Sequence, residues 1–129
     1  MSDAPTISII DDDEFVRDAL QTLVESVGYA TIGFSSAEEF INSNRICDTS
    51  CLIADVQMSG MSGFDLHDWL IKNLHNIPLI LLTGLPTERF KVRATKSIAA
   101  DLQSKPIGLE RLMVCLERAL NGSVKQAAG

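Results

Sequence analysis

Residues 9–20 read IIDDDEFVRDAL and join an apolar run directly to three aspartates and a glutamate. Like charges that lie close together repel more strongly as water is removed, so carboxylates crowded at the end of a buried strand require an explanation. They could cap the following helix and complement the positive charge at its N-terminus. Alternatively, a divalent cation could hold neighbouring carboxylates in their ionised form. The residues at the ends of the other predicted strands show how well cation binding explains this stretch.

Short apolar runs alternate with helical patterns along the chain. We expect strands over residues 6–10, 30–34, 51–54, 78–82 and, more weakly patterned, 99–103. Between them, apolar residues recur at three- and four-residue steps, as on one face of a helix. The third helix, for example, carries the stripe Leu66, Trp69, Leu70 and Leu74. The alternation predicts an α/β fold in which a (βα) unit is repeated five times, giving a doubly wound parallel five-stranded sheet.

Length and composition limit the functions to consider. A chain of 129 residues with 46% apolar residues can bury a single core, and we expect one domain over residues 1–121 followed by a flexible tail or the start of a linker over residues 122–129. No apolar stretch is long enough for a membrane span, and the first residues lack a secretory signal pattern, so we expect a cytoplasmic protein without membrane partners. The net charge of −6 argues against direct nucleic-acid binding. The three cysteines are expected to be reduced, and His67 and His75 to lie at the surface.

Chemically useful side chains follow four of the five predicted strands. Asp11 and Asp12 end the first run, Asp55 the third and Thr83 the fourth, and Lys105 follows the fifth. Ligands bind beyond the carboxyl ends of such strands. Carboxylates gathered there suit Mg²⁺, and one of them could attack a phosphoryl group to form an aspartyl phosphate. A lysine and a hydroxyl group on neighbouring strands would then meet the phosphoryl oxygens.

The stretches IIDDDEFVR, IADVQMSGMSGFDL, LILLTG and ADLQSKPI, in this order, make the chain resemble a response-regulator receiver domain of two-component signalling. The likeness is strongest to receivers that precede a LuxR/FixJ-type helix-turn-helix domain. It implies a flavodoxin-like strand order 2-1-3-4-5 and Asp55 as the phosphoacceptor. It also implies that Mg²⁺ is bound by Asp11, Asp12, Asp55 and the backbone carbonyl of Gln57. Thr83 and Lys105 would contact the phosphoryl group, and the bond between Lys105 and Pro106 would be cis.

The same resemblance implies partners. A histidine kinase would donate the phosphoryl group, and the fourth helix with the fifth strand would form a homodimer or output surface. A basic stripe of Arg89, Arg93 and Lys96 lies on that expected helix. A DNA-binding output domain outside this chain would make it a transcription regulator. Because Gln57 could orient an attacking water and Leu85 cannot, we expect the phosphoryl group to persist for minutes or longer.

Two other functions remain open from the sequence. Asp11 and Asp13 also resemble the DxD motif of haloacid-dehalogenase-type phosphatases, in which Asp11 would be the nucleophile of an enzyme. That class usually has a longer chain and a further acidic pair, which favours the receiver. A receiver-like interaction module that is never phosphorylated is the third reading, although such modules typically lack one or more of the site residues.

Overall fold

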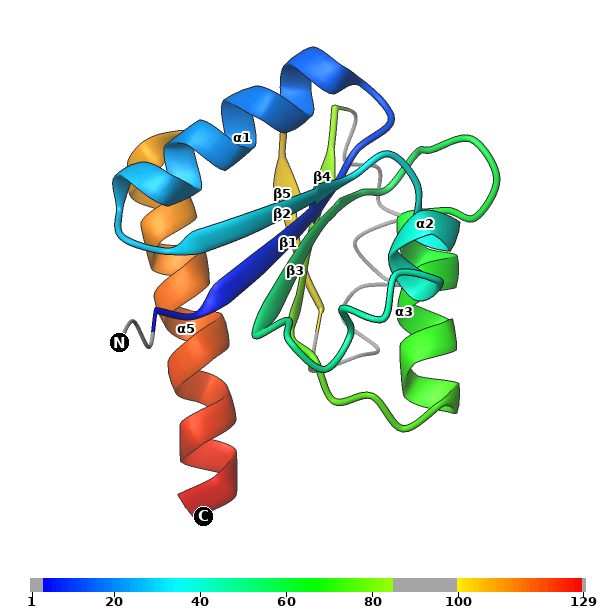
Figure 1. The fold of residues 1–129 in the computed structure, drawn as a ribbon. Coiled ribbons are helices and arrows are strands. Elements are labelled where there is room, and N and C mark those ends of the chain that lie inside the picture. The colour runs from blue at the N-terminus through cyan, green and yellow to red at the C-terminus, as the bar shows by residue number, and fades with distance from the viewer. Residues whose placement is uncertain (1–3, 85–99, 129) are drawn as a thin grey trace.

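The computed structural model describes residues 4–84 and 100–128, and its centre is a parallel sheet (Figure 1). The strands are β1 (Thr6–Ile10), β2 (Ala30–Phe34), β3 (Cys51–Asp55), β4 (Leu79–Thr83) and β5 (Ala100–Ser104). They lie in the order β2-β1-β3-β4-β5, and every neighbouring pair is parallel. The predicted fold class and strand order are therefore confirmed.

Helices cover both faces of this sheet. The described helices are α1 (Glu14–Ser26), α2 (Ala37–Ile41), α3 (Gly63–Lys72) and α5 (Leu109–Ala128). Figure 1 shows α1 and α5 on one side of the sheet and α2 and α3 on the other. The expected fourth helix, with its basic stripe, lies outside the described residues, as does Leu85.

The alternation of side chains along a strand divides the interior into two cores. On β3, Leu52 and Ala54 pack in the core under α2 and α3, whereas Cys51 and Ile53 pack in the core under α1 and α5. All four side chains are fully buried. A strand covered on both faces reads as a continuous apolar run because neither set of side chains meets water. Both cores fix β3, and with it Asp55 at its end.

Some local predictions need correction. Leu74 does not extend the apolar face of α3, because it follows the helix with a φ of 61° and is 91% exposed. His67 was expected at the surface but is only 5% exposed. Its spacing from Gly63, Leu66 and Leu70 places it on the helix face that covers the sheet, so position outweighs polarity.

The remaining peripheral features bear on the domain limits and the thiols. Helix α5 continues to Ala128, past the point where the sequence analysis placed the start of a tail. Cys51 and Cys115 are buried, Cys47 is exposed, and all three are free thiols. Among the described helices, none combines the length and apolar character that crossing a membrane requires.

Candidate functional site

The four carboxylates that follow β1 divide into two pairs. Asp13 is the N-cap of α1, and its side chain accepts hydrogen bonds from the backbone N–H groups of Phe15 at 2.9 Å and Val16 at 3.3 Å. Glu14 lies in the first turn, where a negative charge complements the helix dipole. Asp11 and Asp12 lie instead at the carboxyl edge of the sheet. The capping explanation therefore accounts for Asp13 and Glu14, but not for Asp11 and Asp12.

Asp11, Asp12 and Asp55 form the acidic cluster of the site. Each offers one carboxylate oxygen, and these oxygens lie within 4.8 Å of one another. Asp11 is buried, Asp55 is partly buried and Asp12 is exposed, so the cluster opens to solvent on one side. Asp55 belongs to β3 and the other two follow β1, and these strands are neighbours in the sheet. The adjacency of strands far apart in sequence is what assembles the cluster.

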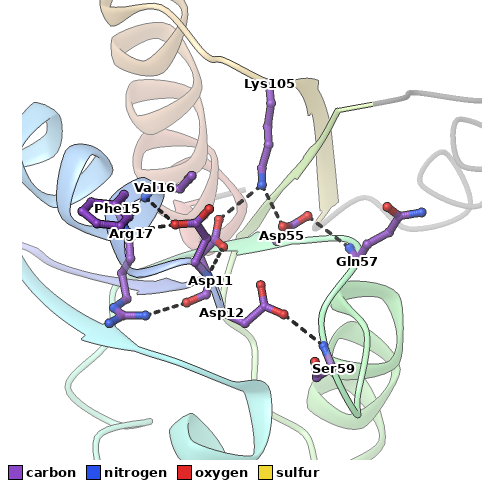
Figure 2. Close-up of polar contacts among 10 residues, drawn as sticks. Asp11, Asp12, Phe15, Val16, Arg17, Asp55, Gln57, Ser59 and Lys105 are labelled. Atoms are coloured by element: carbon purple, nitrogen blue, oxygen red, sulfur yellow. Dashed lines mark hydrogen bonds and ion pairs between the residues drawn. The ribbon is translucent and has the colours of Figure 1, made fainter.

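Lys105 joins the cluster from the far strand (Figure 2). Its Nζ lies 2.7 Å from Oδ2 of Asp55 and 3.3 Å from Oδ2 of Asp11. The lysine follows β5, and its backbone N–H donates a 2.8 Å hydrogen bond to the carbonyl of Thr83 at the end of β4. The bond between Lys105 and Pro106 is cis, as the resemblance implied. One ammonium group thus contacts two carboxylates.

Burial and the charges in the cluster shift the pKa values of Asp11 and Lys105. Burial raises the pKa of Asp11, although the backbone N–H of Asp13 and the charge of Lys105 oppose this shift. Burial alone would lower the pKa of Lys105, but hydrogen bonds to and charges on Asp55 and Asp11 together raise it. Lys105 is therefore a permanent cation at neutral pH, while the ionised form of Asp11 carries a desolvation cost.

Thr83 lies at the neighbouring strand end and is 1% exposed. The register pairs Asp55 with Leu82, so the threonine is one position beyond the residue opposite Asp55. The backbone N–H of Val56 donates a 2.9 Å hydrogen bond to the carbonyl of Leu82, which ties the segment after Asp55 to β4. Thr83 therefore lies at the same edge of the sheet as the cluster, where the side chains of Asp11, Asp55 and Lys105 are in direct contact.

The loop between β3 and α3 is held by carboxylates from three elements. The backbone N–H of Gln57 donates a 3.1 Å hydrogen bond to Asp55. The N–H of Ser59 donates to Asp12 at 3.2 Å, and that of Met61 donates to Glu38 at 3.0 Å. The side chain of Gln57 points away from Asp55 (Figure 2), so only its backbone is near the cluster. Glu38, on α2, was not predicted as part of this region, because a single exposed glutamate in a helix carries no distinguishing pattern in the sequence.

Gly63 lies directly behind Asp55. A Cβ atom at this position would come within 2.7 Å of the Asp55 carbonyl oxygen and 2.6 Å of Cδ2 of Leu81. The backbone N–H of Gly63 donates a 3.0 Å hydrogen bond to the carbonyl of Val56. The absence of a side chain thus lets the first turn of α3 pack against the strand that carries Asp55.

The donor set suits a hard divalent cation. Carboxylate oxygens are the ligands that Mg²⁺ prefers, and a site open to solvent lets the ion keep several of its waters. Asp12 and Asp55 offer oxygens on the open side, while buried Asp11 gains from a cation because its charge is poorly solvated. The residues therefore fit Mg²⁺ in both chemistry and placement.

Comparison with known proteins agrees with this geometry. The model of the response regulator receiver domain family matches residues 7–117. The chain is a response regulator receiver domain. Such receivers act in two-component systems as signalling domains, and the haloacid-dehalogenase reading is wrong for this chain. Asp13 caps α1, so the DxD resemblance had no counterpart in the acidic cluster.

Relatives of this receiver include transcriptional regulators. The response regulator protein TodT of Pseudomonas putida is 39% identical over 127 residues, which cover 98% of this chain and 56% of that protein. The transcriptional regulatory protein FixJ of Azorhizobium caulinodans is 32% identical, with 98% and 60% covered. The crystal structure titled FixJ-N superposes with a TM-score of 0.80 at 33% identity, covering 94% of this chain and 96% of that one. The chain thus spans a little over half the length of these full-length relatives.

Proposed function

We propose that this receiver takes a phosphoryl group onto Asp55 from the phosphohistidine of a histidine kinase, with Mg²⁺ held by Asp11, Asp12, Asp55 and the carbonyl of Gln57. The observation that carries the proposal is the position of Lys105, whose ammonium contacts Asp55 and Asp11 at the edge of a three-carboxylate cluster. Such a cation is suited to pairing with a phosphoryl group that arrives on Asp55.

The transfer exchanges one bond to phosphorus for another. A carboxylate oxygen of Asp55 attacks phosphorus, the P–N bond to the kinase imidazole breaks, and the imidazole nitrogen keeps the electron pair and takes a proton from solvent. When bound, Mg²⁺ supplies neutralisation of charge on the phosphoryl oxygens. Lys105 pairs with those oxygens, and the Thr83 hydroxyl donates a hydrogen bond to them. Thr83 ends β4 and Lys105 follows β5, so the backbones of both residues are fixed by neighbouring strands.

The modified aspartate then shifts the receiver toward an active conformer whose output surface includes the fourth helix and β5. A homodimer through this surface and a DNA-binding output domain outside the chain would make the receiver part of a transcription regulator. TodT is a response regulator and FixJ is a transcriptional regulatory protein, which supports this assignment. We assign residues 1–121 to the receiver, residues 122–129 to a tail or the start of a linker, and the protein to the cytoplasm.

Intact mass spectrometry tests the chemistry. The chain is incubated with Mg²⁺ and acetyl phosphate, beside Asp55→Asn and a sample in excess chelator. We expect a mass gain of one phosphoryl group only for the unmodified sequence with Mg²⁺. A histidine kinase labelled on its histidine then serves as the donor in a second reaction.

Each alternative predicts a different result in that assay. A gain that persists in Asp55→Asn would place the phosphoryl group elsewhere and contradict the proposal. No gain with either donor, in a folded chain that binds Mg²⁺, would support the interaction module that is never phosphorylated. Decay of the modified species within seconds would contradict the expected lifetime of minutes.

A further inference from the structure

Arg17 reaches from the first turn of α1 back to the end of β1. Its Nη1 donates a 2.8 Å hydrogen bond to the main-chain carbonyl of Asp11, which Figure 2 shows beside the acidic cluster. The backbone N–H of Asp11 is held separately, by a 3.1 Å hydrogen bond to the carbonyl of Phe34 on β2. The carbonyl that Arg17 binds belongs to the peptide unit that joins Asp11 to Asp12. Arg17 therefore fixes the backbone between two of the three clustered carboxylates.

The path of the arginine side chain depends on a bare position in β2. A Cβ atom on Gly33 would lie 3.2 Å from Cδ of Arg17 and 2.5 Å from Oε1 of Gln21. Gln21 is itself held, because its Nε2 donates a 3.1 Å hydrogen bond to Oγ1 of Thr31 on the same strand. The space above Gly33 thus accommodates two α1 side chains, and a methyl group there would displace them.

The charge of Arg17 and its hydrogen bond make opposite contributions to cation binding. A guanidinium beside an acidic cluster repels a second cation, so removing that charge alone would strengthen Mg²⁺ binding. The hydrogen bond orients the peptide unit that carries the Asp12 side chain, so removing it would weaken binding. Outer residues that orient metal ligands commonly matter about 10- to 100-fold in affinity. The sign of the change therefore separates the two roles.

We propose that Arg17 is a positioning residue for the divalent-cation site, which it serves by holding the Asp11–Asp12 peptide unit. This inference rests on the proposed function, because it concerns the same cation site. The charged guanidinium forms a charge-assisted hydrogen bond to a carbonyl, which is stronger than a neutral one. The positioning benefit exceeds the repulsion between the guanidinium and the bound cation.

Isothermal titration with Mg²⁺ and with Mn²⁺ tests this role on the full chain. Arg17→Met removes both the charge and the hydrogen bond, and we expect about tenfold weaker binding. Gly33→Ala keeps the charge but places a Cβ 3.2 Å from Cδ of Arg17, so a smaller weakening of binding is expected. Arg17→Lys, which keeps a cationic donor, should recover part of the affinity. Arg45→Met is the matched control, because Arg45 pairs with Asp48 before β3, at the opposite edge of the sheet from Asp55.

The outcomes separate this inference from the proposed function. Unchanged or tighter binding by Arg17→Met, in a chain whose unfolding in chelator matches the parent, would overturn the positioning role and leave the cation site intact. If that variant does not fold, unchanged or tighter binding by Arg17→Gln, whose shorter neutral side chain also loses the charge and the hydrogen bond, would overturn the role equally. No binding of either ion by the parent chain would overturn the cation site and the role of Arg17 together.

Discussion

Replacing Gly63 by alanine should destabilise the receiver, because the new methyl group would meet atoms that cannot move independently. Its Cβ would lie 2.6 Å from Cδ2 of Leu81, 2.7 Å from the Asp55 carbonyl oxygen and 3.2 Å from Cα of Val56. Leu81 is fully buried, and the other two contacts are backbone atoms. The first turn of α3 must therefore shift away from β3 by several tenths of an ångström.

The magnitude follows from two opposing contributions. Overpacking a well-filled core costs about 1–3 kcal/mol. Alanine is a better helix former than glycine by up to about 1 kcal/mol, which offsets part of this cost. We expect a net loss of about 1–2 kcal/mol in the free energy of unfolding, or a fall in Tm of about 4–8 °C for a domain of this size.

Urea unfolding followed by the fluorescence of Trp69, the single tryptophan, measures this loss. Gly84→Ala is the matched control, because Gly84 is exposed, no atom of a non-adjacent residue lies within 4 Å of its added Cβ, and no positive φ disfavours the side chain. We expect that variant to stay within about 0.5 kcal/mol of the parent. Equal stability of the two alanine variants would refute the reasoning about close packing behind Asp55.

Asp11, the three cysteines and Asp13 can each be tested by a separate measurement. Asp11→Asn should raise the free energy of unfolding at pH 7 in chelator, because the raised pKa of Asp11 means that its ionised form destabilises the folded state. This gain should vanish as the pH falls below the ordinary pKa of 3.8, and a loss of stability at pH 7 would contradict the prediction. A thiol reagent should modify only Cys47 quickly in the native chain, because burial protects the thiols of Cys51 and Cys115 and raises their pKa values to about 12 and about 11, respectively. Rapid modification of all three thiols before denaturation would refute this prediction. Asp13→Ala should lower the free energy of unfolding by about 1 kcal/mol, because α1 loses its N-cap, and should leave phosphorylation of Asp55 unchanged. Loss of phosphorylation in a folded variant would contradict the conclusion that Asp13 serves as a helix cap.

Local sequence patterns predict most of the fold and most residues of the candidate site. Apolar runs predicted every described strand to within one residue. The signal was strongest for β3 and β4, because strands buried on both faces are continuous apolar runs, and weakest for the edge strand β5, which reads ADLQS. The site residues followed from their places at strand ends, since parallel strands bring those ends to one edge. The strand order itself came from the family resemblance, because spacing along a chain does not specify which strands become neighbours.

Contacts between residues far apart in the sequence could not be predicted from local patterns. Nothing local to Glu38 indicates that its carboxylate accepts the backbone N–H of Met61, 23 residues away. Arg17 likewise gives no sequence signal of its hydrogen bond to the Asp11 carbonyl, which depends on where α1 crosses β2. His67 was misplaced because its polarity was weighed above its position on the buried face of α3. Such roles depend on packing between elements.

Chemical trapping of the phosphoryl group tests whether Asp55 is the phosphoacceptor. The chain is phosphorylated with Mg²⁺ and acetyl phosphate and then treated with borohydride, which reduces an acyl phosphate on aspartate to homoserine, and the modified position is read by peptide mass spectrometry. We expect homoserine at position 55 and an unmodified chain in the Asp55→Asn variant. Homoserine at position 11, the nucleophile of the phosphatase reading, would contradict it.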